Sequence, residues 1–282
     1  MSEHLKRQYA RLKKIAPKEL GGSAVADLIR EMVLHARNML AGYELIHFTS
    51  LVPDKRYIGY RATTESRPIN TDLYIQEAGE FTRLIEAFLH GMPEASAYEI
   101  TKITYSIALS IFAAHDVNQV GRKASATFFE ILIGHIVARL LDVAPRKKVR
   151  MPESEAELPT DYVFELGAGR RKVHLPIKTS TRERAVQAWV HQLVLDRIFG
   201  NGVYTGIFVV CGETKRDSRT GEIIEICVPQ QLQMFQSRVA QLSRVYYLDP
   251  PKAYMELAKK FPRVEVRSFG EAFRDLRGLL ET

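Results

Sequence analysis

The chain has 282 residues, of which 46% are hydrophobic and 26% are charged, and its formal net charge is +7. These values describe an ordinary globular protein with one large domain or two modest ones. Residues 1–14 are charged and no apolar run approaches the length of a membrane span. We therefore expect a soluble intracellular protein without a secretory signal or a membrane partner.

The basic balance favours a polyanionic partner such as nucleic acid. Cys211 and Cys227 lie in separate strand-like segments without the spacing of metal ligands. We expect both to be buried thiols.

The first 115 residues are predicted to be mostly helical, because apolar positions recur there at helical intervals. The pattern is present in residues 24–45, 77–89 and 97–114. Residues 51–72 are rich in Pro, Thr, Arg and Asp, which predicts a long connection with a short strand at 56–62.

After Asn118 strand-like and helix-like segments alternate. Residues 126–141 form a helix that is apolar on nearly every side and must be largely buried. Gly167, Ala168 and Gly169 form a turn that predicts a hairpin between strands at 162–166 and 171–178. Later helices are expected at residues 183–199, 230–243, 251–260 and 271–281, and strands at residues 204–211, 223–228, 245–248 and 264–267. This alternation predicts an α/β fold whose mixed sheet is covered by helices.

Asp161 enters the first strand of the predicted hairpin, and Lys178 ends the second. Adjacent strand ends bring such residues close together, and an acid with a lysine is the minimum for metal-assisted phosphodiester cleavage. Mg²⁺ takes hard oxygen ligands and neutralises charge on the phosphate, while a lysine orients or deprotonates the attacking water. The alternatives are a turn residue for Asp161 and a surface amine for Lys178.

Glu130 lies within the apolar run of residues 128–133, where an ionised carboxylate is costly without a partner. A metal ion is one such partner, so we expect Asp161 and Glu130 to be the metal ligands. A structural ion pair and a solvent-facing position on the helix are the competing explanations.

Arg182, Glu183 and Arg184 open the helix that follows Lys178. An arginine pairs bidentately with guanine, and a carboxylate accepts a hydrogen bond from cytosine. Recognition helices commonly present their first residues to base edges, so the triplet is a candidate reader of adjacent G and C bases. A solvated helical turn is the alternative.

These residues resemble type II restriction endonucleases of the PD-(D/E)XK superfamily, in the branch whose targets contain CCGG or interrupted CC and GG. Thr160 and Asp161 resemble the PD element, and Pro176 to Lys178 resemble the (D/E)XK element without its acid. The triplet at 182–184 resembles the base-reading signature, and Glu130 the acid on the preceding helix. The resemblance covers about residues 121–200.

The sequence departs from that branch at the displaced acid, which usually returns thirteen or fourteen residues after the lysine. His191 and Gln192 occupy those places. Gln192 is therefore a candidate catalytic residue that offers an amide oxygen to the metal or to its water. His191 is a candidate general base, or else a packed or surface histidine.

The resemblance implies a PD-(D/E)XK nuclease-like core at residues 118–282 and a helical region at 1–117 for dimerisation or DNA contact. It also implies a prokaryotic, cytoplasmic homodimer that cleaves double-stranded DNA at a palindromic site with Mg²⁺, leaving 5′-phosphate ends. A structure-selective repair nuclease or junction resolvase of the same fold and a DNA-binding protein with impaired catalysis are the alternatives.

Overall fold

The protein is described by a computed structural model that covers residues 3–91, 95–152, 155–182, 185–261 and 263–281. The chain divides into two compact units. The first unit contains residues 1–136 and 214–226, and the second contains residues 137–213 and 227–282. The division falls within one long helix, whereas the character of the sequence changes at residue 118.

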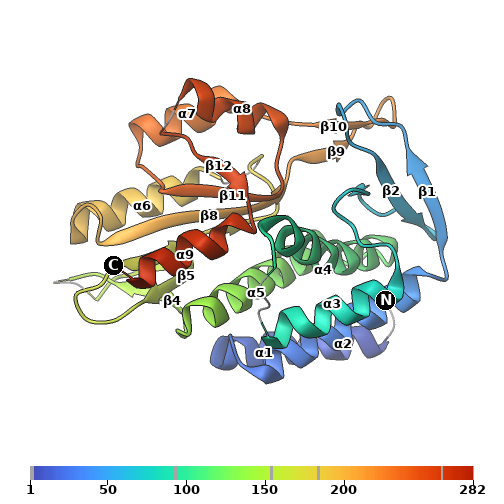
Figure 1. Ribbon diagram of the computed structural model, residues 1–282, viewed down its shortest axis with the longest axis horizontal. Helices are drawn as coiled ribbons and strands as arrows, with labels where there is room; N and C mark the ends of the chain where they lie inside the picture. The colour runs from blue at the N-terminus through green and yellow to red at the C-terminus, as the bar shows by residue number, and fades with distance from the viewer. Residues whose placement is uncertain (1–2, 92–94, 153–154, 183–184, 262, 282) are drawn as a thin grey trace. The chain divides into compact units, whose positions relative to one another are not determined.

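The first unit is mainly helical, as the apolar spacing predicts (Figure 1). Its helices are α1 (Glu3–Glu19), α2 (Ser23–Leu40), α3 (Ala78–Gly91), α4 (Ala97–Val117) and the first part of α5 (Arg122–Leu141). Ser96 and Glu99 form a reciprocal capping box at the start of α4, which satisfies two backbone donors there. The helix expected at 24–45 ends at Leu40 because residues 44–48 belong to a strand.

A small antiparallel sheet accompanies these helices, with strand order β1-β2-β3. Its strands are β1 (Glu44–Phe48), β2 (Tyr57–Arg61) and β3 (Ile69–Asn70). The hairpin of β9 (Thr214–Arg216) and β10 (Ile223–Glu225) belongs to the same unit. It is attached through Ile223, whose N–H donates to the Thr49 carbonyl and whose carbonyl accepts from the Leu51 N–H.

Helix α5 is long and apolar enough to cross a membrane by length and composition, over Lys123–Leu141. Of that window, 67% is buried inside the protein. The core helix of a globular protein has the same properties, so the segment is weak evidence for a membrane span.

In the second unit, the described residues form a seven-stranded mixed sheet in the order β12-β11-β8-β6-β5-β4, with β7 beside β8. The strands are β4 (Arg146–Arg150), β5 (Glu157–Glu165), β6 (Lys172–Leu175), β7 (Ile177–Lys178), β8 (Tyr204–Gly212), β11 (Arg244–Asp249) and β12 (Val266–Ser268). Neighbours from β4 to β6 are antiparallel, and the pairs from β6 to β12 are parallel. This topology confirms the predicted mixed sheet and the hairpin of β5 and β6.

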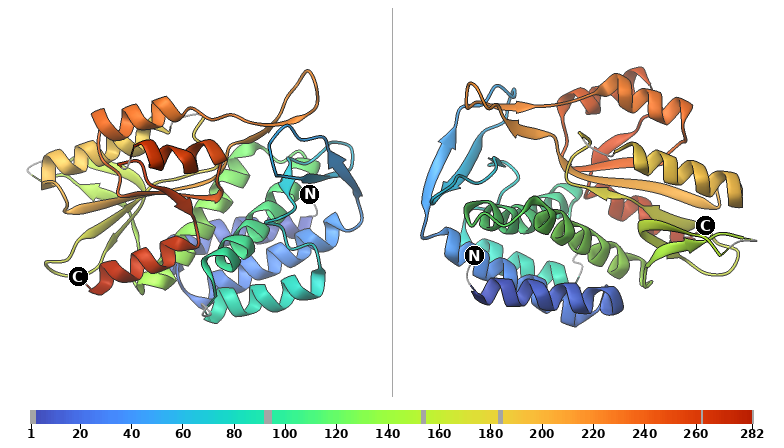
Figure 2. Two further views of the ribbon diagram at one scale, coloured as in Figure 1. Left: turned by 45° about the horizontal axis from the view of Figure 1, so that its top comes forward. Right: turned by 180° about the vertical axis from the view of Figure 1, so that it is seen from behind.

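Helices cover both faces of this sheet (Figures 1 and 2). They are α6 (Val186–Phe199), α7 (Pro229–Arg238), α8 (Lys252–Lys260) and α9 (Glu271–Glu281). Alternate residues of β11 point to opposite faces. Val245 packs with residues of α6, α7 and α8, whereas Tyr246 donates a hydrogen bond to Asp275 of α9.

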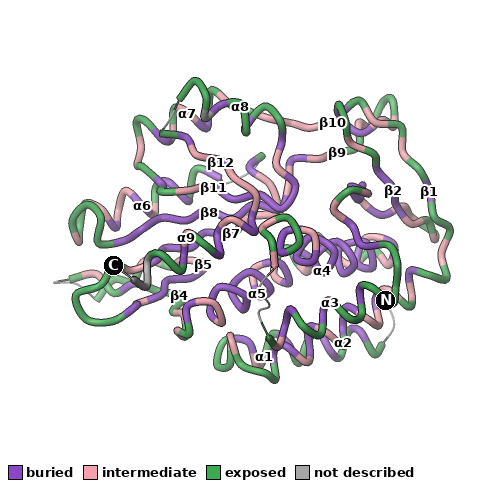
Figure 3. Tube along the Cα trace, viewed as in Figure 1, coloured by how far each residue is buried: buried purple, intermediate pink, exposed green. Residues whose placement is uncertain are grey.

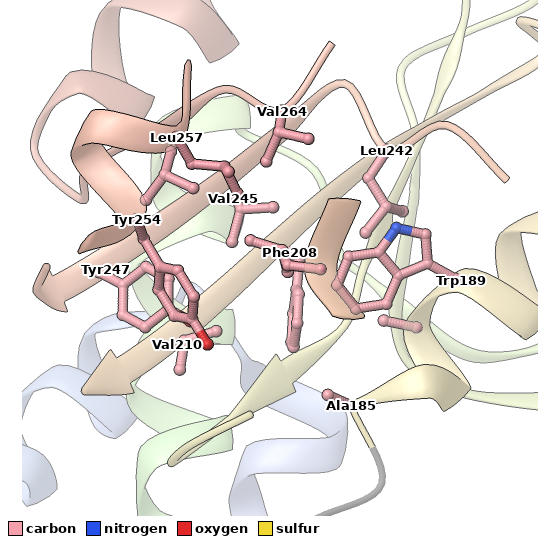
Figure 4. Close-up of a cluster of buried hydrophobic side chains, with 13 residues drawn as sticks. Ala185, Trp189, Phe208, Val210, Leu242, Val245, Tyr247, Tyr254, Leu257 and Val264 are labelled. Carbon is pink, nitrogen blue, oxygen red and sulfur yellow. The ribbon is translucent and has the colours of Figure 1, made fainter. Parts of the chain in front are cut away.

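Trp189 belongs to the buried cluster on the face covered by α6, α7 and α8 (Figure 4). It is fully buried, and its ring is 5.5 Å from that of Phe208 on β8. Its indole N–H donates to Gln236 of α7 at 2.9 Å, so the polar edge of the ring is satisfied. Trp189 is therefore a packing residue, as its helical spacing indicates.

The basic run at 146–150 is the edge strand β4, whose burial is limited to Val149. One expectation about local structure is wrong. Cys211 is buried as expected, but Cys227 is only partly buried, because it lies beyond the end of β10.

Candidate active site

Asp161 and Lys178 meet where the hairpin of β5 and β6 ends. Lys178 Nζ donates to Asp161 Oδ2 at 2.8 Å, and the backbone N–H of Ile177 donates to the same oxygen at 2.8 Å. The side chains retain 25% exposure for Lys178 and 23% for Asp161. The predicted pair is therefore present and accessible to solvent.

Pro176 explains how the chain reaches this geometry. Proline has no backbone N–H for the sheet, and it separates β6 from β7. The chain then pairs β7 with β8, with Lys178 opposite Val210. The N–H of Ile177 donates to the side-chain carboxylate of Asp161 on β5.

The pair offers one carboxylate oxygen to a cation. Asp161 Oδ2 accepts two hydrogen bonds, whereas Oδ1 accepts none from the described part of the chain. Within that part, no group of three or more His, Cys, Asp and Glu residues is arranged to hold a metal. Mg²⁺ keeps several waters and is commonly held by one or two carboxylates together with substrate phosphates, so Asp161 fits its requirements.

Two histidines lie beside the pair. His174 is on β6, His191 is on α6, and their ring centroids are 6.3 Å apart. Burial lowers the pKa of the His174 ring to about 4. Burial also lowers the pKa of His191. The charge of Asp161 raises this pKa and that of Lys178 lowers it, and both effects are smaller than that of burial. Both rings are therefore neutral near pH 7.

The structure does not bring Gln192 to the Asp161–Lys178 pair. Gln192 is buried, and its Oε1 lies 3.0 Å from His174 Nδ1. Its Nε2 donates to Asp196 Oδ1 at 2.8 Å and to the Tyr204 carbonyl at 2.9 Å. These bonds link α6 to β6 and β8, so the geometry favours a structural role for the amide, and its catalytic role stays a prediction.

Gly206 on β8 makes this arrangement of Gln192 possible. A Cβ at residue 206 would lie 2.5 Å from Gln192 Oε1 and 2.6 Å from a methyl group of Leu242. We expect Gly206→Ala to destabilise the protein by about 1–3 kcal/mol, as overpacking of a core does. Thermal or urea denaturation measures the loss.

Gly278 on α9 provides the matched control, because a Cβ there meets nothing within 4 Å. Gly278→Ala should be neutral or stabilise the helix by up to about 1 kcal/mol. Equal stability of the two variants would contradict the tight contact at Gly206.

Of the three residues predicted to read bases, Arg182, Glu183 and Arg184, the structure describes only Arg182. Arg182 is exposed in the turn after Lys178, and its Nε donates to Ser180 Oγ at 3.3 Å. Glu183 and Arg184 lie outside the described residues. Helix α6 begins at Val186, so Arg182 belongs to the turn before the helix rather than to its first turn.

Glu130 lies in α5, in the part that belongs to the first compact unit. The residue is partly exposed, which fits the alternative that it faces solvent on this helix. Its role as a metal ligand stays a prediction.

The cationic residues of β4 also have partners. Lys148 Nζ contacts Glu157 at 2.5 Å, Arg146 lies 3.6 Å from Glu165, and Lys147 stacks on the Tyr162 ring at 4.9 Å. The positive charge of this run is therefore partly neutralised by carboxylates of the neighbouring strand β5.

Glu213 is the residue near this site that the sequence analysis missed. It directly follows β8 and is fully buried. Its Oε1 accepts hydrogen bonds from the backbone N–H of Thr181 at 2.8 Å and from Thr181 Oγ1 at 2.6 Å. An acid directly after a continuous apolar strand was the available signal.

Comparisons with known proteins show which fold the chain has. No family model matches the chain, and no curated protein matches it. The crystal structure of the type IIP restriction endonuclease Kpn2I is similar to it with a TM-score of 0.85 and 23% sequence identity, covering 98% of this chain and 97% of that one. The restriction endonuclease PspGI in a complex with substrate DNA matches with a TM-score of 0.42 and 14% identity, over 66% of this chain and 79% of that one. The first likeness shows that the chain has the fold of a type IIP restriction endonuclease over nearly its whole length.

Proposed function

We propose that the chain is a type II site-specific deoxyribonuclease that cleaves double-stranded DNA with Mg²⁺ in the prokaryotic cytoplasm. The observation that carries this proposal is the Asp161–Lys178 pair, which is partly exposed at the end of the hairpin. The fold shared with a type IIP restriction endonuclease supports the same reaction.

Each residue of the pair has a distinct task in phosphodiester hydrolysis. Asp161 would hold Mg²⁺ while its Oδ2 stays anchored by the Ile177 N–H. When bound, the cation would supply positive charge to offset the charge that develops on the phosphate. Lys178 donates from Nζ to the attacking water or to a phosphate oxygen. Water adds to phosphorus as the bond to the 3′ oxygen breaks, leaving a 5′-phosphate and a 3′-hydroxyl.

Base recognition is assigned to Arg182, Glu183 and Arg184. Arg182 is exposed and follows the catalytic lysine by four positions, which supports a base-reading role beside the scissile bond. The chemistry of an Arg-Glu-Arg triplet favours adjacent G and C bases. Its resemblance to the base-reading signature of one restriction endonuclease branch supports a target with CCGG or interrupted CC and GG. A palindromic target implies a two-fold homodimer in which each subunit reads one half-site.

Arg182→Ala tests the reading role. We expect it to cost about 1–3 kcal/mol of discrimination at the base pair that Arg182 contacts. Cleavage rates on the preferred site and on sites with one changed base pair measure this discrimination. Arg197 on α6 is also exposed, and Arg197→Ala should leave the preference unchanged. An unaltered preference in Arg182→Ala would remove the triplet from base recognition.

Incubation of plasmid DNA with the protein and Mg²⁺ tests the proposed activity. Discrete fragments are the expected result. Unselective degradation or nicking at junctions would instead indicate a repair nuclease or resolvase of the same fold. Binding without cleavage would indicate a DNA-binding protein with impaired catalysis.

A further inference from the structure

The turn between the proposed catalytic residue Lys178 and the proposed base-reading residue Arg182 is held by hydrogen bonds at both ends. At its start, Lys178 is paired with Asp161, and the Gly212 N–H donates to the Thr179 carbonyl at 3.3 Å. At its end, the backbone N–H and the hydroxyl of Thr181 both donate to Glu213 Oε1. Thr181 is 6% exposed, whereas the next residue, Arg182, is exposed.

The acid that holds this turn is itself held by the core. Tyr247 of β11 donates its hydroxyl to Glu213 Oε1 at 3.0 Å. Tyr254 of α8 lies 3.4 Å from the Thr181 hydroxyl, and its own hydroxyl accepts from the Val228 N–H. Figure 4 shows both tyrosine rings within the buried cluster above β8. Glu213 and Thr181, which together hold the turn, are therefore connected to buried tyrosines of β11 and α8.

A buried carboxylate at this position is costly. Glu213 is fully buried, and its Oε2 has no hydrogen-bond partner among the described residues. Burial raises the pKa of the Glu213 carboxyl, while the bonds from Thr181 and Tyr247 and the charge of Arg182 lower it. An apolar side chain would avoid the desolvation cost, so stability alone does not account for an acid here.

We propose that Glu213 is a positioning residue that fixes the turn between Lys178 and Arg182 and so sets the register between bond cleavage and base reading. This inference rests on the proposed function. Glu213 touches neither Asp161 nor Lys178 by any hydrogen bond within the described residues, so its loss acts on the reading side chain more than on the cleavage chemistry.

The test uses the full-length protein, Mg²⁺ and a duplex DNA library with a randomised central segment, whose cut ends are sequenced. Glu213→Ala should lower the preference for the best site over sites with one changed base pair by about tenfold or more, the factor expected when both hydrogen bonds that hold Thr181 are lost. Thr181→Val removes only the hydroxyl donor and should relax the preference in the same direction if Glu213→Ala does not fold.

Two matched variants separate positioning from general stability. Glu213→Gln keeps an oxygen that accepts both bonds from Thr181, so it should retain the site preference to within about threefold. Tyr247→Phe removes the bond from the sheet to the same carboxylate but leaves those from Thr181. It should relax the preference less than Glu213→Ala does, even if the melting temperature falls.

The inference is overturned if folded Glu213→Ala or Thr181→Val keeps the wild-type preference. It is also overturned if Tyr247→Phe relaxes the preference as much as Glu213→Ala does, or if Glu213→Gln behaves like Glu213→Ala. Absence of site-specific cleavage by the wild-type protein would instead overturn the proposed function.

Discussion

Lys178→Ala is expected to slow DNA cleavage on the order of a thousandfold, the loss typical of removing one positioned donor or proton-transfer group. Lys178 Nζ lies 2.8 Å from Asp161 Oδ2 at the end of the hairpin. Both side chains are partly exposed, so loss of the ion pair should change stability by about 1 kcal/mol or less. Plasmid cleavage assays measure the rate, and DNA binding without Mg²⁺ should be retained.

Lys172 supplies the control for this variant. It lies on β6 of the same hairpin, is partly exposed and pairs with Glu165 at 3.0 Å. Lys172→Ala should cleave at close to the wild-type rate. If Lys178→Ala also retained full cleavage, the catalytic role of Lys178 would be refuted.

Asp161→Asn is expected to reduce cleavage by a similar factor, on the order of a thousandfold at the Mg²⁺ concentration that saturates the wild-type protein. Asparagine has nearly the same shape and retains an oxygen for the Ile177 N–H, but it lacks the negative charge that Mg²⁺ and Lys178 require. Cleavage rates measured over a range of Mg²⁺ concentrations should show a weakened metal dependence.

Glu165 on the same strand provides a matched carboxylate. Glu165→Gln removes a charge that pairs with Lys172 and Arg146 rather than with Lys178. It should keep both the rate and the Mg²⁺ dependence of the wild type. An Asp161→Asn protein with an unchanged Mg²⁺ profile would contradict Asp161 as the metal ligand.

The proximity of Asp161 and Lys178 could be predicted from sequence because it depends largely on one local element, the hairpin of β5 and β6. Gly167 and Gly169 both have positive φ, of 131° and 74°, so the turn between the two strands is marked by residues that tolerate it. The hairpin brings Asp161 on β5 close to the end of β6, and Lys178 follows three residues later on β7, which pairs with β8. Periodicity likewise predicts α9 to its observed bounds, Glu271–Glu281.

The rest of the site depends on contacts between distant segments. Thr181 and Glu213 meet because β7 pairs in parallel with β8. The local sequence around Lys178 does not indicate which strand lies beside it. Gln192 occupies the place expected of a metal ligand by spacing, but His174 and Asp196 engage its amide. The groups that contact this amide depend on which strands lie beside α6, and helical spacing carries no information about those strands.

Arg182 shows the same limit at a helix boundary. The charged triplet reads as a helix start, yet α6 begins at Val186, after the turn that Glu213 holds. The hydrogen bond that holds Thr181, the residue before the triplet, is accepted by Glu213, and the local charge pattern carries no information about this distant partner.

Sequencing the ends of plasmid fragments produced by the wild-type protein with Mg²⁺ tests the central claim most directly. Cleavage by a site-specific nuclease places every cut within one shared sequence, and we expect that sequence to be palindromic, to contain CC and GG and to carry 5′-phosphate ends. Cuts distributed without a shared sequence would contradict the account.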